Sequence, residues 1–430
     1  MTAPIDVLFI HNNFPGQYKL LARHLAADPK FRVFAIGSQT ATDIKGVKLQ
    51  RYRVPSGSAA RVHSFARRFE IECRRAEQII YAANVLRLDG MAPKIIFVHP
   101  GWGESLPLRQ LFPGSKICVY CEFYYSAKGA DVGFDPEFQE YGIDGQTRIQ
   151  LRNAATLLAL VDADVGIAPT AWQRSVFPPE FQSKIRVLHD GIDTKQLAVA
   201  SPSTYPALPD GLQAGSEILT YVARGLEPYR GFHVFMRALP RILSARQNCQ
   251  VCIVGSTDVA YGSAPASGAT WKDVMLSELS EELDLSRIHF LDRVPHPQLV
   301  SLLRASRAYI YLTYPFVLSW SLLEAMALGC RIIASDVEPV REVLTHRQNA
   351  MLVPFFDVEA LAQTAIRVLQ APSQFDQIAK RASELAHSQF SFSGKIAPLF
   401  DDLMATLVPD IANAFSDRVN PADFRKKRHA

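Results

Sequence analysis

Long apolar runs are absent from this sequence, and so are several short motifs that mark other protein classes. No window reaches 18 consecutive apolar residues, so no membrane-spanning helix is expected. Asp6 interrupts the first apolar run, so no secretory signal peptide is expected either. Six cysteines without framework spacing indicate a reducing compartment such as the cytoplasm. The net charge of +4 is modest and shows no concentrated basic face, which argues against nucleic-acid binding.

Two local clusters need separate interpretation. The segment RKKRHA, Arg425–Ala430, is interpreted as a solvated tail, with contact to anionic lipid headgroups as the alternative. Cys118 and Cys121 have the spacing of a redox pair, but KICVYCEF has the pattern of a buried strand with no helix start after the first cysteine. Packing in a core is therefore the preferred interpretation for both thiols.

The apolar segments that are present are short and β-branched, which indicates parallel strands separated by helices. With 430 residues, 48% of them hydrophobic, the chain exceeds one hydrophobic core, and two domains are expected. The strand rhythm stops at TKQLAVASPSTYPALPDGLQAGS, a linker candidate rich in Pro, Ser, Ala and Gly, and then restarts. The expected strands are IDVLFIH, FRVFAIG, KIIFVH, KICVYC, DVGIA and IRVL before this linker, and ILTYVA, VCIVG, IHFL, AYIYL, RIIA and AMLV after it.

This pattern predicts an α/β fold of two Rossmann-like, doubly wound parallel-sheet domains facing across a cleft, with ligands at the carboxyl ends of the strands. The first strand-end loop, HNNFPGQY, places Gly16 before a helix start at Gln17, where free N–H groups would point at a ligand. A plain turn is an equally good interpretation. The dinucleotide motif G-x-G-x-x-G is absent after every strand.

Aromatic and acidic side chains gather in the next two strand-end loops, HPGWGESLPL and CEFYYSAKGADVGFDPEF. Aromatic rings pack on the C–H face of a sugar while carboxylates accept its hydroxyl hydrogens, so a sugar or polyol site is expected. The alternative for the histidine is that it only caps its strand. The candidate sugar or acceptor contacts are His99, Trp102, Glu104, Glu122 and Tyr124.

The first loop of the second half, ARGLEPYRGF, holds two arginines at one strand end. Arg224 and Arg230 flank a turn before a helix, and two guanidinium groups there favour a dianionic partner such as a diphosphate. An exposed salt bridge is the alternative for either arginine. The next loop, TDVAYGSAPASGATWKD, is long and carries Tyr261, which favours a ligand-binding role.

Several blocks resemble family 4 glycosyltransferases of the GT-B architecture: YVARGLEPYRGF, VLHDGIDT, IHFLDRVPHPQLVSLLRASRAYIYLT, LLEAMALGCRIIASDVEPVREVL and NAMLVPFFD. NNFPGQY, HPGWGES and YCEFYYSAKGADVGFDPEF resemble a bacterial subgroup of that family associated with surface polysaccharide assembly. The resemblance implies an acceptor domain over 1–200 and a nucleotide-sugar donor domain over 215–395. It also implies a helix over 396–415 that crosses back to the first domain, followed by a basic tail over 416–430.

The resemblance assigns nucleotide contacts to the second half. Glu324 matches a family glutamate that hydrogen-bonds the ribose hydroxyls, whereas its spacing from Ser321 would also suit a capping box. The amides expected to face the diphosphate are those of Val317, Leu318 and Ser319. The backbone expected to hold the base is that of Arg293 and Val294.

The remaining roles also follow from the resemblance. Arg224 and Arg230 match the pair that clamps the donor diphosphate and stabilises charge on the leaving nucleotide. His99 matches a histidine near the donor sugar, and Gly16 matches the glycine of the first loop. One position departs from the family, because the first of its two usual glutamates falls at Phe316, which makes the region around the transferred sugar more apolar.

The resemblance thus implies a retaining, metal-independent transferase that moves a sugar from a nucleotide-diphosphate sugar to a glycan, glycolipid or protein acceptor. No Asp-x-Asp motif stands at the donor loops, Asp162 and Asp164 precede a strand instead, and no metal or other cofactor is expected. Two alternatives stay open: a nucleotide-sugar-binding subunit without transfer, and a sugar-nucleotide epimerase of the same architecture. The expected location is the cytoplasm, with peripheral contact to the inner membrane left open and no nucleic-acid partner.

Overall fold

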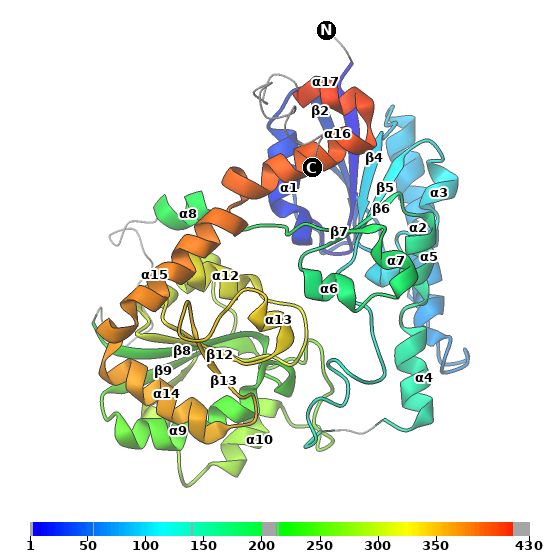
Figure 1. Ribbon diagram of the computed structural model, residues 1–430. Coiled ribbons are helices and arrows are strands. Elements are labelled where there is room, and N and C mark those ends of the chain that lie inside the picture. The colour runs from blue at the N-terminus through cyan, green and yellow to red at the C-terminus, as the bar shows by residue number, and fades with distance from the viewer. Residues whose placement is uncertain (1–2, 55, 139–140, 200–211, 213–214, 416–430) are drawn as a thin grey trace. The chain divides into compact units, whose positions relative to one another are not determined.

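The computed structural model describes residues 3–54, 56–138, 141–199, 212 and 215–415 (Figure 1). It divides into two compact units. The first unit comprises Met1–Ala127, Glu140–Gly191 and Phe392–Ala430, and the second comprises Lys128–Gln139 and Ile192–Ser391. The segment Lys128–Gln139, called the arm below, belongs to the second unit although its neighbours in sequence on both sides belong to the first.

The first unit contains a seven-stranded parallel sheet in the order β3-β2-β1-β4-β5-β6-β7. Its strands are β1 (Ile5–Ile10), β2 (Phe31–Gly37), β3 (Val47–Arg51), β4 (Ile95–Val98), β5 (Lys116–Tyr120), β6 (Val165–Ala168) and β7 (Ile185–Val187). Successive residues of a strand face opposite sides, and both sides are covered, so the central strands are apolar at nearly every position. Phe9 packs in one buried cluster with Phe400, whereas Leu8 packs in the other with Ile79.

Helices cover both faces of this sheet. The face of Phe9 is packed by α1 (Lys19–Ala26), α16 (Ala397–Leu407) and α17 (Pro409–Phe415) (Figure 1). The opposite face is packed by α2 (Arg67–Leu88), α3 (Leu108–Leu111) and α5 (Ala154–Asp162). The other helical segments of the first unit are η1 (Gly16–Tyr18), η2 (Pro100–Trp102), α4 (Ile143–Leu151), α6 (Ala171–Ser175), α7 (Pro179–Gln182) and η8 (Phe392–Ile396).

The second unit contains a six-stranded parallel sheet in the order β10-β9-β8-β11-β12-β13. Its strands are β8 (Glu217–Gly225), β9 (Cys249–Ser256), β10 (Ile288–Phe290), β11 (Ala308–Tyr311), β12 (Ile332–Ser335) and β13 (Met351–Val353). Its helical segments are α8 (Thr194–Val199), η4 (Pro228–Arg230), α9 (Phe232–Ala245), α10 (Trp271–Glu278), η5 (Leu285–Arg287), α11 (His296–Ala305), α12 (Trp320–Ala327), α13 (Glu338–Arg341), α14 (Val358–Gln370), η6 (Pro372–Phe375), α15 (Asp376–Leu385) and η7 (Ala386–Phe390).

The two doubly wound parallel sheets confirm the predicted fold class, and all twelve expected strands are present. Strand β3 was not expected, because its sequence VKLQR contains no apolar run. It lies at the edge of its sheet, where partly exposed polar side chains are tolerated.

The division of the chain differs from the predicted boundaries in three places, one of which is that the second unit ends at Ser391 rather than at residue 395. The second unit begins at Ile192 rather than beyond residue 200, and it includes the arm, which the sequence placed in the first domain. The predicted linker contains α8, and its residues 200–211 and 213–214 lie outside the described residues, as does the basic tail over 416–430. Helices α16 and α17 belong to the first unit.

Candidate functional site

Each sheet has one place where the strand order reverses. It lies between β1 and β4 in the first unit and between β8 and β11 in the second. The loops that leave adjacent strands diverge at such a point and make room for a ligand at the carboxyl ends. Most of the predicted site residues fall in these loops, in one group within each unit.

The first-unit group is a chain of hydrogen bonds between the loops that follow β1, β4 and β5. His11 Nε2 lies 2.7 Å from Gln17 Oε1, and Gln17 Nε2 donates to Glu122 Oε1 at 2.8 Å. His99 Nε2 lies 3.2 Å from the second oxygen, Glu122 Oε2. Gln17 and His99 therefore converge on one carboxylate, and His11 holds Gln17.

The backbone fixes which nitrogen of each histidine carries its hydrogen. Gly101 N–H donates to His99 Nδ1 at 3.1 Å, and Asn13 N–H donates to His11 Nδ1 at 3.0 Å. Both Nδ1 atoms are therefore acceptors, so each Nε2 carries a hydrogen and donates it. His99 thus caps η2, the turn that follows its strand, and also holds Glu122, so it does more than cap a strand.

Aromatic packing and one glycine complete this group. The Trp102 ring lies 4.5 Å from the His99 ring and 5.1 Å from the His11 ring, centroid to centroid. Gly16 has φ +46°, and a Cβ built on it would lie 2.4 Å from His11 Nε2. Gly16 is therefore required for the close approach to His11, which is a packing reason for a glycine at this position.

The Glu122 carboxylate is ionised at neutral pH. Burial raises the pKa of Glu122, but the hydrogen bonds from His99 and Gln17 and the fields of both histidines outweigh burial and lower it overall. About a third of the side chain, 36%, stays exposed. Glu122 can therefore accept a hydrogen bond from a hydroxyl of a bound molecule.

Two predicted sugar contacts lie away from this group. Glu104 is fully buried and accepts a hydrogen bond from the Tyr52 hydroxyl at 2.6 Å, and burial raises its pKa. A carboxylate at 0% exposure cannot meet a ligand, so the prediction for Glu104 is wrong in this structure. Tyr124 packs against Phe177 on the side of the sheet that α2 and α5 cover.

The second-unit group centres on Arg230, which is only 4% exposed. Its Nη1 donates to Thr313 Oγ1 at 2.8 Å, Val317 O at 3.1 Å and the Tyr311 hydroxyl at 3.3 Å. Among the described residues, none offers Arg230 a carboxylate within 4.0 Å. The printed hydrogen-bond acceptors of Arg230 are neutral oxygens, and the buried Glu227 carboxylate acts on it only through its field. An anion bound at Arg230 would therefore add a direct charge-assisted partner.

Arg224 lies at the end of β8 and is exposed. It has neither a hydrogen-bond nor an ion-pair partner in the part of the chain that the structure describes. The salt-bridge alternative therefore holds for neither arginine within those residues. Arg224 offers a complete guanidinium group for an incoming ligand.

Glu227, which the sequence interpretation missed, anchors the loop after β9. It is 0% exposed, and its carboxylate accepts hydrogen bonds from the amides of Ala260, Tyr261 and Gly262 at 2.8–3.3 Å. This brings the Tyr261 ring to 5.2 Å from Arg230 Cζ. The signal in the sequence was an acid within the turn GLEPYRG, but its partners are more than 30 residues away.

Phe316 lies in the same group. It is 4% exposed, and its ring meets Tyr261 at 5.0 Å and Tyr229 at 5.4 Å in edge-on geometry. Arg230 Cζ lies 5.7 Å from the Phe316 ring centroid. Arg230 is thus bordered by the rings of Tyr261 and Phe316. Phe316 occupies the position at which the family resemblance implies a glutamate.

Glu324 contacts a histidine from the neighbouring loop. Glu324 Oε1 lies 2.8 Å from Nε2 of His296, which opens α11. Helix α12 has Ser319 as its N-cap residue, without a side-chain capping bond, and Ser321 Oγ pairs with Ser319 Oγ at 2.7 Å. The capping-box alternative for Glu324 is therefore wrong, and the carboxylate faces the loop that also carries Val294.

The predicted backbone contacts are distributed as follows. The Val317 carbonyl accepts a hydrogen bond from Arg230, and the Ser319 N–H donates one to the Tyr311 hydroxyl at 3.0 Å. Arg293 is exposed, with an Asp258 oxygen 4.0 Å away. Val294 packs against the core, and Leu318 is partly buried. The structure thus brings Arg230, Tyr261 and Phe316 together with the loop Val317, Leu318 and Ser319, and brings Glu324 to the 292–296 loop.

One group in the described residues has the composition of a metal site. Ligand atoms of Asp135, Glu137 and His233 lie within 4.8 Å of one another. However, Arg237 binds both Glu137 oxygens at 2.6 Å, while Tyr314 and His233 engage Asp135 at 2.8 and 3.0 Å. We interpret the group as an ion-pair network because these partners already use the carboxylates.

Two other sequence interpretations concern structural groups. Asp164 precedes β6 and accepts from Arg109 at 2.7 Å and Lys116 at 3.0 Å, far along the strand from the carboxyl ends. Cys118 and Cys121 are free and buried, and burial raises the pKa of Cys121 to about 12. Both thiols therefore pack in the core rather than forming a reactive pair.

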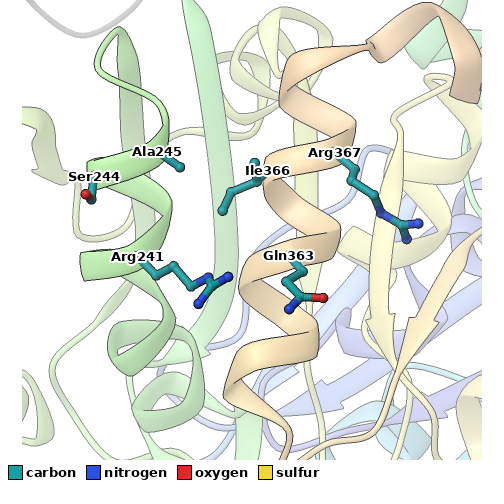
Figure 2. A pocket seen from close by; sticks show the side chains of 6 residues that line it. All are labelled: Arg241, Ser244, Ala245, Gln363, Ile366 and Arg367. Carbon is teal, nitrogen blue, oxygen red and sulfur yellow. The ribbon is translucent and has the colours of Figure 1, made fainter.

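A shallow hollow lies away from both strand-end groups. Figure 2 shows Arg241 and Ile366 extending into the space between α9 and α14 in the second unit. Arg241 is paired with Glu359 at 2.9 Å. The hollow lies on the helical layer, so we do not assign it to the candidate site.

Comparison with known proteins identifies the family of the chain. The model of the glycosyl transferase family 4 group matches residues 29–197, and that of glycosyl transferases group 1 matches residues 209–385. A phosphatidyl-myo-inositol mannosyltransferase of Mycolicibacterium smegmatis is 29% identical over 44% of this chain and 45% of its own length. A glycogen synthase of Mycobacterium tuberculosis is 25% identical over 49% and 46%. The chain thus spans about half the length of these relatives.

Solved structures show the same fold. A sucrose-phosphate synthase from Thermosynechococcus elongatus has a TM-score of 0.69 at 18% identity, covering 94% of this chain and 99% of its own. Anabaena HepE in complex with UDP and glucose has a TM-score of 0.64 at 16% identity, covering 96% and 99%. Two adjoining family models that together run from residue 29 to 385, on two doubly wound parallel sheets, place this chain among the family 4 glycosyltransferases of the GT-B architecture.

Proposed function

We propose that this protein transfers a sugar from a nucleotide-diphosphate sugar to a glycan, glycolipid or protein acceptor. The observation that carries the proposal is Arg230, a buried guanidinium at the strand-order reversal of the second sheet, with no carboxylate partner among the described residues. A diphosphate would supply the missing negative charge. It is also the group on which charge develops when a sugar leaves a nucleotide.

In this proposal the donor lies along the second-unit loops. Arg230 and the exposed Arg224 hold the diphosphate, so the leaving charge is stabilised without a metal ion. Glu324 exchanges its contact with His296, 2.8 Å long, for the ribose hydroxyls. The anomeric configuration is retained, as the resemblance to the family implies.

The first unit supplies the acceptor side. Glu122 is ionised, partly exposed and fixed by His99 and Gln17, which suits it to accept a hydrogen bond from an acceptor hydroxyl. Trp102 offers an aromatic face beside it. Surface polysaccharide assembly at the cytoplasmic face of the inner membrane is the proposed setting. The described helices include none that combines the length and the apolarity needed to cross a bilayer.

A nucleotide-sugar panel tests the proposal. The full chain is screened with UDP- and GDP-sugars for thermal stabilisation, since a ligand at 100 times its dissociation constant adds about 2.7 kcal/mol. The stabilising donor is then incubated with candidate glycan acceptors, and the product is analysed by mass and by the anomeric coupling in its NMR spectrum. Absence of stabilisation by every donor would contradict the proposal.

Metal independence is tested with the same assay. Turnover is expected to persist in EDTA, because the arginine pair carries the leaving-group charge. A rate that collapses with chelator and returns with Mn²⁺ or Mg²⁺ would contradict this part of the proposal.

A second candidate is a nucleotide-sugar-binding subunit without transfer. Phe316 favours it, because a buried phenyl ring stands where family members usually have a glutamate near the transferred sugar. This candidate predicts donor binding without product on any acceptor. A Phe316→Glu variant that gains turnover while the wild type has none would support the second candidate over the first.

A further inference from the structure

The arm, Lys128–Gln139, reaches the second unit directly from the acceptor-side loop of the first. Only residues 121–127, which include Glu122, lie between β5 and the arm. The arm nevertheless packs with the second unit. A segment from the first half of the sequence therefore contributes to the unit that contains the donor-side sheet.

Two phenylalanines anchor the arm in aromatic clusters. Phe134 joins the second-unit core, and Phe138 packs edge-on against its partners. The ring partners, with centroids 4.9–5.3 Å apart, are Tyr314, Phe355 and Phe356 for Phe134, and His233 and Trp271 for Phe138. Such pairs contribute beyond their buried area and fix the arm in one position.

Two arm carboxylates, Asp131 before the first anchor and Asp135 between the two, hold two tyrosines. The Tyr229 hydroxyl donates to Asp131, and the Tyr314 hydroxyl donates to Asp135 Oδ2 at 2.8 Å. The tyrosines also bond to each other, because Tyr314 N–H donates to Tyr229 O at 2.9 Å, and their rings lie 4.9 Å apart. The two loops that carry them are therefore joined at the backbone and tied to the arm at both side chains.

These loops are the ones that build the Arg230 site. Tyr229 immediately precedes Arg230 after β8. Tyr314 lies after β11, two residues before Phe316 and three before Val317, whose carbonyl accepts from Arg230 at 3.1 Å. A shift of either tyrosine would thus move the guanidinium or its acceptor.

We propose that Asp131 and Asp135 are positioning residues of the donor site: from the arm they clamp the two strand-end loops that hold Arg230, and so fix the geometry offered to the diphosphate. The nucleotide part of this inference rests on the proposed function. The clamp itself does not.

The charge state of Asp135 suits a clamp. Asp135 is 4% exposed, and burial raises its pKa, but hydrogen bonds from His233, from the Glu137 amide and from Tyr314 outweigh burial and lower the pKa overall. The carboxylate is therefore ionised at neutral pH. A hydrogen bond to an ionised buried acceptor is stronger than one between neutral groups.

Three variants of the full chain separate the clamp from general stability. Asp135→Asn keeps the side-chain shape but leaves one oxygen where there were two. Tyr314→Phe removes the donor from the opposite side and keeps the ring. Asp164→Asn is the matched control, since Asp164 is another hydrogen-bonded aspartate whose pKa is lowered, but it belongs to the first unit.

The first measurement needs no ligand. Hydrogen exchange followed by mass spectrometry reports on peptides that span 312–319 and 226–232. Both clamp variants are expected to speed exchange there about 10-fold, the size of one lost charged hydrogen bond, and the control is expected to leave it unchanged. Unchanged exchange in both clamp variants would overturn the clamp.

The second measurement uses nucleotides. Calorimetry compares UDP with uridine, and GDP with guanosine, for each variant. Asp135→Asn is expected to weaken the tighter-binding diphosphate about 10-fold and its nucleoside much less, because the clamp positions the phosphate loops. A general loss of stability would affect both alike. Faster exchange with unchanged diphosphate affinity would overturn the positioning role. If the wild type binds neither diphosphate, the proposed function fails, whereas the exchange result still decides the clamp.

Discussion

The groups at the strand ends of the two units differ in how their polar atoms are satisfied. In the first unit, His11, Gln17 and His99 all donate within the chain, and Glu122 receives two of these hydrogen bonds at 2.8 and 3.2 Å. In the second unit, Arg230 is 4% exposed, and its hydrogen-bond acceptors among the described residues are neutral oxygens. In the first group the carboxylate is paired directly with its donors, whereas in the second no described carboxylate lies within 4.0 Å of the Arg230 guanidinium.

This difference indicates different tasks. A carboxylate already fixed by its neighbours can accept a hydroxyl hydrogen with little rearrangement, which suits recognition of a neutral polyol. A buried guanidinium that has only neutral hydrogen-bond acceptors gains a charge-assisted partner when an anion binds, so its contribution to ligand affinity depends on the charge of the ligand. We therefore expect ligand charge to matter greatly in the second unit and little in the first.

The largest expected effect comes from Arg230→Met, which keeps much of the side-chain length but removes the charge. Affinity for UDP or GDP is expected to fall by about 3 kcal/mol, roughly 100-fold, because charge-assisted hydrogen bonds contribute about 1.5–3 kcal/mol each. Stability should fall as well, since the buried Val317 carbonyl loses its donor. Calorimetry and thermal unfolding measure the two effects.

Arg224→Ala is the comparison for this variant. Arg224 is exposed and has no partner among the described residues, so its removal should leave the melting temperature unchanged while weakening the same diphosphate. Unaltered diphosphate affinity in both arginine variants would contradict the conclusion that ligand charge matters more in the second unit than in the first.

Glu324→Gln is expected to have a smaller effect. If the carboxylate accepts ribose hydroxyls, nucleotide affinity should fall by about 1–3 kcal/mol, since one acceptor oxygen replaces two. Stability should change little, because His296, the partner of Glu324, is 41% exposed. A 2′,3′-dideoxy nucleotide should bind the wild type and the variant almost equally weakly. Normal nucleotide affinity in the variant would show that Glu324 pairs with His296 and does not bind the ribose.

The sequence predicted the fold well because the determining signal is local. Buried parallel strands need apolar residues at nearly every position, and such runs are visible without knowing their neighbours. Among the strands of the described residues, β3 alone was not predicted, because an edge strand can carry polar residues such as Lys48 and Gln50. Arg224 and Arg230 were also singled out from local sequence, because two like charges at one strand end need an explanation.

The polar partners could not be predicted in the same way. Gln17 is 105 residues from Glu122, Tyr52 is 52 from Glu104, and these separations carry no periodic signal. Burial of Arg230 and the placement of the arm in the second unit depend on the same long-range contacts. Glu104 shows the consequence, because an acid in an aromatic loop suits a sugar contact until the fold buries it.

The smallest expected effect comes from Glu122→Gln in the first unit, which tests the contrast between the Glu122 and Arg230 groups. Glu122→Gln should leave affinity for UDP and GDP unchanged, because Glu122 belongs to the group that needs no anion. It should lower stability at neutral pH by less than about 1 kcal/mol, given that a third of the side chain is exposed.

The pH dependence of that small effect has a definite sign. The pKa of Glu122 is lower in the folded chain than the value of about 4.3 expected when unfolded. Its contribution to stability is therefore complete above the unfolded pKa and is lost as the pH falls through the folded pKa. Thermal unfolding of wild type and variant between pH 7 and pH 3 should give curves that are offset at pH 7 and converge towards pH 3. Curves that diverge as the pH falls would mean that Glu122 is held neutral, and the contrast between a self-satisfied carboxylate and an unpaired guanidinium would not hold.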